Sequence, residues 1–213
     1  MGIPVGQAHP QEARRGAEGN LSSRSHSNTN VQEVIAIDYL DKECAVFRKT
    51  RAKWGVFSNF HPTSLKTHVI WPTSEHLYQA LKSKDPVVQE YIRVQSTPAA
   101  AKTVGHQVKI RNDWEEIKID AMTCVLWIKY HQRPEFVKAL IVSGDREIVE
   151  YSRYDTFWGA KPTRRHLQNG KGEILRGHNV LGRLLMRLRD TDGMVPHIKS
   201  ELFIMEEKLT WNF

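Results

Sequence analysis

The polar and apolar positions of the sequence follow helical spacing over several stretches, most clearly after residue 113. There the apolar residues recur every three or four positions, as is typical of an amphipathic helix. They form one stripe, which is made of Trp114, Ile117, Ala121, Val125 and Ile128. Asp113 and Glu116 have the spacing of a capping box, so the pattern predicts that the longest helix of the chain begins here.

Five shorter helices are predicted from start and stop signals. Ser74 can cap the first of them, and Pro86 breaks it. Thr97 followed by Pro98 is typical of a helix start, and Gly105 is typical of a helix end. The predicted ranges are 75–82, 87–94, 99–104, 134–143 and 179–189.

Strands are few and short in the predicted fold. Runs rich in β-branched and aromatic residues indicate strands at 34–37, 45–47, 65–71 and 147–151. The stretch 161–178 contains little apolar material, and we expect it to be a loop between the turn at Trp158 and the last helix. Together these elements predict an α+β fold, namely a single, mostly helical domain with a few short strands.

The two ends of the chain differ in composition from the part between them. Residues 1–30 are rich in Gly, Ser, Asn and Gln and poor in aromatic residues, which predicts a disordered N-terminal tail. Residues 31–190 are expected to form the domain. In the appended segment 191–213, the apolar run 202–205 favours a helix that docks on the domain.

Composition narrows the class of protein. The apolar runs are far shorter than the ~20 residues of a membrane span, and no signal peptide is visible, so we expect no membrane partner. Cys44 and Cys124 lie far apart, with no CxxC and no histidine at ligand spacing. We therefore expect free thiols, no metal, and a location in the cytoplasm, or in the nucleus if the source is a eukaryote.

The chain is basic, with a formal net charge of +7 among 213 residues. A positive charge favours polyanionic partners such as nucleic acids and nucleotides. The predicted loop carries much of it, on Arg164, Arg165, Lys171 and Arg176. This loop either contacts phosphates or is a solvated basic loop. The sequence has no P-loop, GxGxxG, HExxH or GxSxG motif.

One predicted helix carries a chemically useful set of side chains. Glu75, Gln79 and Lys82 lie at i, i+4 and i+7, so a carboxylate, an amide and an amine share one helix face. The simpler interpretation is a solvated polar face. The nearby aromatic turn favours the alternative, that this face lines a pocket.

Aromatic residues gather with turn residues at 54–60, 71–78 and 154–159, and each cluster contains an amide or a carboxylate. Those polar residues are Asn59, Glu75 and Asp155. Such clusters suit the stacking of a base while its ribose is held. We expect Trp158 to line this pocket and Trp114, on the apolar stripe, to lie in the core.

Seven ordered motifs between residues 45 and 189 resemble the NADAR (YbiA-like) family of N-glycosidases. They are FSNF at 57–60, WPTSEHLYQA at 71–80, TPAAAKTVG at 97–105, RNDW at 111–114, SGD at 143–145, DTFWG at 155–159 and NVLGRLLM at 179–186. The resemblance implies an enzyme without metal or cofactor that cleaves the bond between ribose C1 and an exocyclic amino nitrogen. The implied partner is ADP-ribosylated nucleic acid, from which ADP-ribose is removed at guanine, or a small molecule of nucleotide type.

The chemistry of a ribosyl-amine explains why these residue types belong together. The sugar can open to an imine, onto which a neutral lysine exchanges as a Schiff base. We predict Lys82 as this amine, with Lys102 as the rival, Glu75 as the proton shuttle and Asp155 as the group that holds the ribose or water. The predicted substrate-binding residues are Asn59, Phe60, Trp71, Gln79, Trp158, Gly159 and Asn179.

Three other functions remain open at this stage. The resemblance also fits enzymes that cleave phosphoribosylamino-pyrimidine intermediates of riboflavin synthesis. A module that binds ADP-ribose or NAD without cleaving it would keep the pocket but need no reactive lysine. A structural or RNA-associated basic protein would need only the charge.

Overall fold

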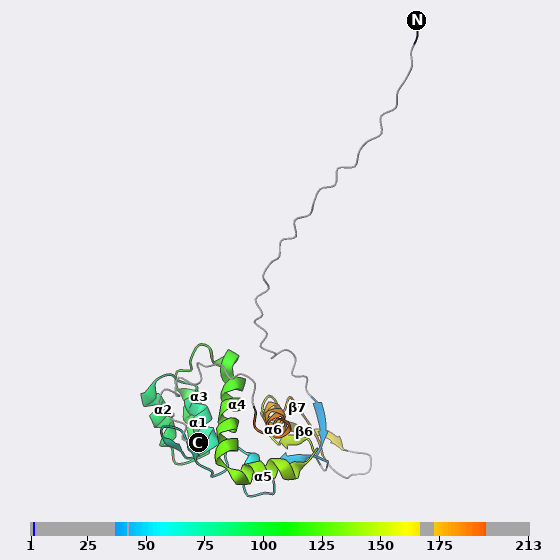
Figure 1. The fold of residues 1–213 in the computed structure, drawn as a ribbon, viewed down its shortest axis with the longest axis horizontal. Coiled ribbons are helices and arrows are strands. Elements are labelled where there is room, and N and C mark those ends of the chain that lie inside the picture. The colour runs from blue at the N-terminus through cyan, green and yellow to red at the C-terminus, as the bar shows by residue number, and fades with distance from the viewer. Residues whose placement is uncertain (1, 3–36, 42, 167–172, 195–213) are drawn as a thin grey trace. The chain divides into compact units, whose positions relative to one another are not determined.

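The computed structural model describes residues 2, 37–41, 43–166 and 173–194 (Figure 1). All of its helices and strands belong to one compact unit, Val34–Phe213. The predicted tail, apart from Gly2, and the predicted C-terminal helix lie outside the described residues. The division into tail, domain and appended segment stays a prediction.

Six α-helices occur within the described residues, close to the predicted ranges. They are α1 (Ser74–Ala80), α2 (Pro86–Arg93), α3 (Pro98–Gln107), α4 (Trp114–Gln132), α5 (Pro134–Ser143) and α6 (Val180–Asp190). Of the helices in these ranges, none is both long and apolar enough to cross a membrane.

The strands form three small sheets. They are β1 (Ile37–Leu40), β2 (Ala45–Phe47), β3 (Leu65–Lys66), β4 (Ile70–Trp71), β5 (Ile148–Glu150), β6 (Lys161–His166) and β7 (Glu173–Gly177), with a 3₁₀ turn, η1, at Gly55–Phe57. β1, β7 and β6 form an antiparallel sheet, β3 and β4 a short antiparallel pair, and β2 and β5 a parallel pair. The predicted α+β fold is confirmed.

The prediction of a loop over 161–178 is wrong. Residues 161–166 and 173–177 are the strands β6 and β7, which pair with each other and, through β7, with β1. In β7, Leu175 is fully buried and pairs with the buried Tyr39, whereas the neighbouring Arg176 is exposed. Leu175 packs in a small cluster with Tyr39, Val149 and Ala160, so residues far away in sequence decide the conformation of this strand.

Several predicted element ends also differ from the structure. Thr73, not Ser74, is the N-cap of α1, and its hydroxyl accepts a hydrogen bond from the His76 amide. α3 continues through Gly105 to Gln107. Asp113 does not cap α4 with its side chain, because its carboxylate accepts two hydrogen bonds from the guanidinium of Arg111.

Two predicted strands were placed imperfectly as well. The strand predicted at 65–71 is two short strands, β3 and β4, joined by a turn. The first strand covers Ile37–Leu40 instead of 34–37, of which 34–36 lie outside the described residues.

Helix α4 lies at the centre of the core, between the group α1–α3 and the side that holds α6, β6 and β7 (Figure 1). Its Val125 and Leu126 are fully buried. Lys129 on the same helix is also fully buried, and its Nζ donates to the carbonyl oxygens of Val56 (2.6 Å) and Ser58 (3.1 Å). This lysine fixes the backbone that leads to Asn59.

Candidate active site

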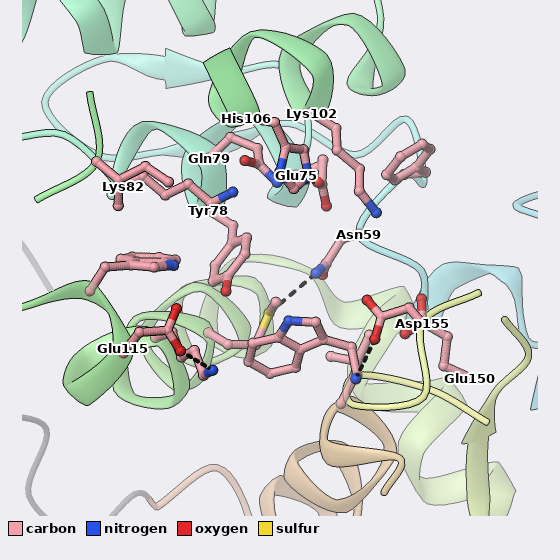
Figure 2. Close-up of a pocket in the computed structure, with 17 residues that line it drawn as sticks. Asn59, Glu75, Tyr78, Gln79, Lys82, Lys102, His106, Glu115, Glu150 and Asp155 are labelled. Carbon is pink, nitrogen blue, oxygen red and sulfur yellow. Dashed lines mark hydrogen bonds and ion pairs between the residues drawn. The ribbon is translucent and has the colours of Figure 1, made fainter. Parts of the chain in front are cut away.

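A cavity of about 300 Å³ opens where the helices meet the end of β5 (Figure 2). Its lining comes from α1, α3, α4 and α6, from the segment after η1, and from the segment between β5 and β6. Its walls carry both charged and aromatic side chains. The lining residues are Asn59, Phe60, Glu75, Tyr78, Gln79, Lys82, Lys102, His106, Ile110, Trp114, Glu115, Lys118, Met122, Glu150, Asp155, Trp158 and Leu181.

Helix α1 brings Glu75 and Gln79 to this cavity. Every residue of this helix is buried, so the interpretation of its polar face as solvated is wrong. Gln79 Nε2 donates to Glu75 Oε1 at 2.7 Å, one turn away. Burial raises the pKa of Glu75, and the Gln79 hydrogen bond and the charges of Lys102 and Lys82 offset only part of that rise.

Lys82 lies just beyond the end of α1 and is buried, with 5% of its surface exposed. Its Nζ is 3.4 Å from the carbonyl oxygen of Gly105 and lies over the Trp114 ring at 5.9 Å. Burial lowers the pKa of Lys82, and the nearby positive charge of Lys102 lowers it further, against the opposing pull of Glu75. An amine in this environment loses its proton more easily than one in water, as a nucleophilic lysine requires.

The rival Lys102 also lines the cavity, from α3, but it is exposed. Figure 2 shows the two lysine side chains on either side of Glu75, with Lys82 entering from the left and Lys102 extending toward Asn59 on the right. The two amines also differ in burial.

Aromatic rings form another part of the cavity wall. The Tyr78 ring lies 5.3 Å from the Trp114 ring and 5.7 Å, edge to face, from the Trp158 ring. Trp158 lines the cavity as expected. Trp114 is buried as predicted but also lines the cavity, so the separation of core and pocket tryptophans is incomplete.

Asn59 and Phe60 line the cavity from the segment after η1. Asn59 Nδ2 lies 3.2 Å from Met122 Sδ, a weak acceptor. Its Oδ1 is buried and has no hydrogen-bond partner among the described residues. A buried acceptor without a partner in a cavity wall is a natural place for a ligand hydroxyl or amino group.

Asp155 lies on the far wall, in the loop before β6. One of its carboxylate oxygens, Oδ1, accepts hydrogen bonds from the backbone amides of Phe157 (3.0 Å) and Trp158 (2.9 Å). The same two bonds fix Trp158, so the carboxylate and the ring are held as one unit.

Sequence reasoning missed several titratable groups of the cavity, among them Glu150 and His106. Burial raises the pKa of Glu150 to about 8, and Asp155 and Glu75 add to the rise. Burial and the charges of Lys82 and Lys102 lower the pKa of His106. His106 lies one turn after Lys102 on the same helix, a spacing that would have indicated it.

Three predicted substrate-binding residues do not line the cavity. Trp71 is 1% exposed, and its indole N–H donates to Thr67 Oγ1 at 3.0 Å, so its ring is core. Asn179 is fully buried, and its side chain bonds to the backbone of Ile148 and Glu150. Gly159 is buried against Glu150, whose carbonyl oxygen would lie 2.6 Å from a Cβ at this position.

A metal site needs several ligating side chains that lie close together. Within the described ranges, no group of three or more His, Cys, Asp or Glu side chains is arranged to hold a metal ion. That the site uses neither metal nor cofactor stays a prediction.

Two relatives are similar to the chain over most of its length. The N-glycosidase YbiA of Escherichia coli (strain K12) is 35% identical over 147 residues, which are 68% of this chain and 85% of that protein. The chloroplastic riboflavin biosynthesis protein PYRR of Zea mays is 33% identical over 192 residues, which are 78% of this chain and 29% of that protein.

A solved structure and a family model agree with these relatives. The NMR structure of the E. coli protein YbiA has a TM-score of 0.56 at 34% identity, and the match covers 68% of this chain and 82% of that one. The model of the NADAR domain matches residues 46–191. The chain therefore belongs to the NADAR domain family, as the order of its motifs indicated.

Proposed function

We propose that the chain removes ADP-ribose from the exocyclic amino nitrogen of guanine in nucleic acid, through a Schiff base between Lys82 and ribose C1. At the coarser level, relatives named N-glycosidases are about one third identical to the chain, and the chain is a hydrolase that acts on N-glycosyl bonds. The finer proposal concerns the group that is released and the residue that attacks.

The observation that carries the proposal is a buried amine beside carboxyl groups in a cavity with aromatic walls. Burial lowers the pKa of Lys82, which favours the neutral amine that attacks carbon. Glu75 lines the same cavity and is close enough to Lys82 for its charge to act on the pKa of the amine. The rings of Trp114 and Trp158 offer surfaces on which a base can stack.

The reaction proceeds in balanced steps. In ring opening the C1–O bond breaks, the proton of the exocyclic N–H moves to the ring oxygen, and an imine forms between C1 and the exocyclic nitrogen. Lys82 Nζ adds to C1, and Glu75 moves the proton from Nζ to the exocyclic nitrogen. The exocyclic nitrogen then takes up a second proton from an acid of the site, and the C1–N bond breaks with its electron pair on nitrogen. The heterocycle leaves as a neutral amine, and the sugar stays on Lys82 as a protonated imine. Water adds to C1, which frees Lys82 and returns the sugar as an aldehyde that closes again.

The charge of the chain supports a nucleic-acid substrate. The chain carries a net charge of +7, and Lys102 and Lys118 lie on the cavity lining. Cations at the rim attract phosphates and release their counterions. Of the basic residues of the β6–β7 segment, Arg176 is exposed, whereas the side chains of Arg164, Arg165 and Lys171 lie outside the described residues.

The test is incubation of the full chain with an oligonucleotide that carries ADP-ribose on a guanine amino group, followed by mass measurement. We expect the oligonucleotide to lose one ADP-ribosyl group, and free ADP-ribose to appear. Binding of the modified oligonucleotide with no change of mass would identify a binding module instead.

A second candidate, cleavage of phosphoribosylamino-pyrimidines, is favoured by the similarity to the riboflavin biosynthesis protein of Zea mays. Such a substrate has the same C1–N bond and one phosphate in place of the diphosphate and adenosine. Parallel incubation with this compound decides between the two. If only the phosphoribosylamino-pyrimidine is cleaved, that compound is the substrate and ADP-ribosylated guanine is not.

A further inference from the structure

Glu150, the last residue of β5, is a carboxyl group of the cavity that has no role in the reaction above. The other carboxylates have partners, since Glu75 accepts from Gln79, Asp155 from two backbone amides, and Glu115 from Lys118 at 2.5 Å. Across the described part of the chain, by contrast, no residue donates a hydrogen bond to the Glu150 carboxyl or forms an ion pair with it. In Figure 2, Glu150 lies beside Asp155 at the edge of the cavity.

The backbone of Glu150 is held from several sides. Its N–H donates to Asn179 Oδ1 at 3.0 Å, and its carbonyl oxygen accepts from the amide of Ala160 at 2.8 Å. Its strand pairs with β2 so that Glu150 lies opposite Phe47. Gly159 packs against it where a Cβ would not fit. Asn179 and Gly159, predicted to touch substrate, instead fix the residue that lines the cavity.

The surroundings of this carboxyl favour its neutral form. Burial is the main cause that raises its pKa to about 8, and the charges of Asp155 and Glu75 raise it further. Lys102 acts in the opposite direction and is outweighed. Near pH 7 the group therefore holds a proton that it can give away, as a general acid must.

We propose that Glu150 is a further catalytic residue of this site, the acid that protonates the departing amino nitrogen; this rests on the reaction proposed above. The proton moves from the Glu150 carboxyl to the exocyclic nitrogen, and the C1–N bond breaks with its electron pair staying on nitrogen. The heterocycle leaves as a neutral amine, and Lys82 holds the sugar as a protonated imine. The water that adds to C1 returns a proton to Glu150.

The experiment compares Glu150→Gln with the wild type on the substrate that the wild type cleaves. Gln keeps the size of the side chain but cannot give a proton. We expect kcat to fall on the order of 10²- to 10⁴-fold, while the Kd for free ADP-ribose changes less than about twofold. The wild-type kcat should decline above about pH 8 as Glu150 loses its proton. This decline should be absent in Glu150→Gln and kept in Glu150→Asp.

The control is Glu116→Gln, which changes an exposed residue of α4 that does not line the cavity and should leave kcat and its pH profile unchanged. A Glu150→Gln enzyme within a few-fold of wild type, or one that keeps the alkaline decline, would overturn the proposal.

A second readout needs no turnover. Infrared spectra at pH 7 should show the stretching band of a protonated carboxyl that is missing in Glu150→Gln. Absence of the band in the wild type overturns the role of Glu150 by itself. Absence of turnover in a wild type that shows the band instead counts against the proposed function.

Discussion

Lys82 and Lys102 face one cavity, yet only the first has its amine under protein cover. Lys82 is buried against Trp114 and the Gly105 carbonyl, whereas Lys102 is exposed on α3. Desolvation disfavours the charged form of an amine. A mechanism that needs a neutral lysine near pH 7 therefore favours Lys82 over Lys102.

Borohydride added during turnover should fix the sugar to Lys82. The reagent reduces the imine, so the peptide that contains Lys82 gains the mass of the reduced sugar. We expect Lys82→Ala to lose both the adduct and turnover. Lys138→Ala, an exposed control on α5, should keep both. Adduct mass on the Lys102 peptide would transfer the role to that residue, and fast turnover without any adduct would indicate direct attack by water.

Glu75→Gln should lower kcat on the order of 10²- to 10⁴-fold, because the variant cannot carry a proton between Lys82 and the substrate. A Gln at this position keeps the acceptor for the Gln79 amide, so the thermal midpoint should stay close to that of the wild type. Steady-state kinetics and thermal unfolding together check this. Turnover within a few-fold of wild type would exclude a catalytic role for Glu75.

The sequence correctly predicted those cavity residues whose relative positions are set by a single helix. Glu75, Gln79 and Lys82 are related by helical spacing alone, and all three line the cavity. Glu150 was missed because its place in the site depends on pairing with β2, which no local pattern reveals. Trp71 was misplaced because its N–H partner, Thr67, makes it a satisfied core residue.

Close packing of α3 on α1 depends on one glycine of α3, Gly105, at the contact between the two helices. A Cβ at Gly105 would lie 2.2 Å from Gln79 Oε1 and 2.9 Å from Gln79 Cβ. Gly105 was predicted to end the helix, but it lies inside α3 and allows this approach. The approach also brings the Gly105 carbonyl to Lys82.

Gly105→Ala should therefore reduce activity as well as stability. The added methyl group displaces Gln79 and with it the 2.7 Å hydrogen bond to Glu75. We expect kcat to fall at least tenfold, and the clash with Gln79 Cβ to lower the free energy of unfolding by about 1–3 kcal/mol. Gln107→Ala, exposed on the same helix, is the matched control. Wild-type kcat in Gly105→Ala would contradict this account of the packing.

Elements were predictable where the pattern is local. The six described helices lie within a few residues of the predicted ranges. Their signals, an apolar stripe and a proline or threonine at the start, depend only on the residues of the segment itself. The β6–β7 pair was taken for a loop because its residues are mostly basic and polar. Its strands exist through pairing with β1, which lies more than a hundred positions earlier in the sequence.

For the whole molecule, the buried Lys129 couples stability to pH. Burial lowers its pKa from 10.5 to about 7. Between these two values the unfolded chain binds a proton that the folded chain lacks, so the free energy of unfolding rises with pH, by at most about 1.4 kcal/mol per pH unit.

Chemical denaturation between pH 7 and 10 should show this rise in the wild type and a shallower one in Lys129→Met. The difference in slope, not in absolute stability, is the readout, because the variant also leaves the Val56 and Ser58 carbonyls without their donor. Lys138→Met, exposed on α5, should keep the wild-type slope. Equal slopes in Lys129→Met and wild type would show that Lys129 keeps its proton when buried.

The parallel pair of β2 and β5 has a consequence for how the protein is made. Phe47 pairs with Glu150, and the chain between them contains α1 to α5. At synthesis rates of about 5–20 residues per second, the first strand waits roughly 5–20 seconds for its partner. During that interval the helices can form locally, but no cavity exists, and the apolar faces that close on β5 and α6 are open to water. Contacts between distant segments also form slowly. The nascent chain is therefore at greatest risk of aggregation just before residue 150 emerges, and a chaperone that covers α4 would act in that window.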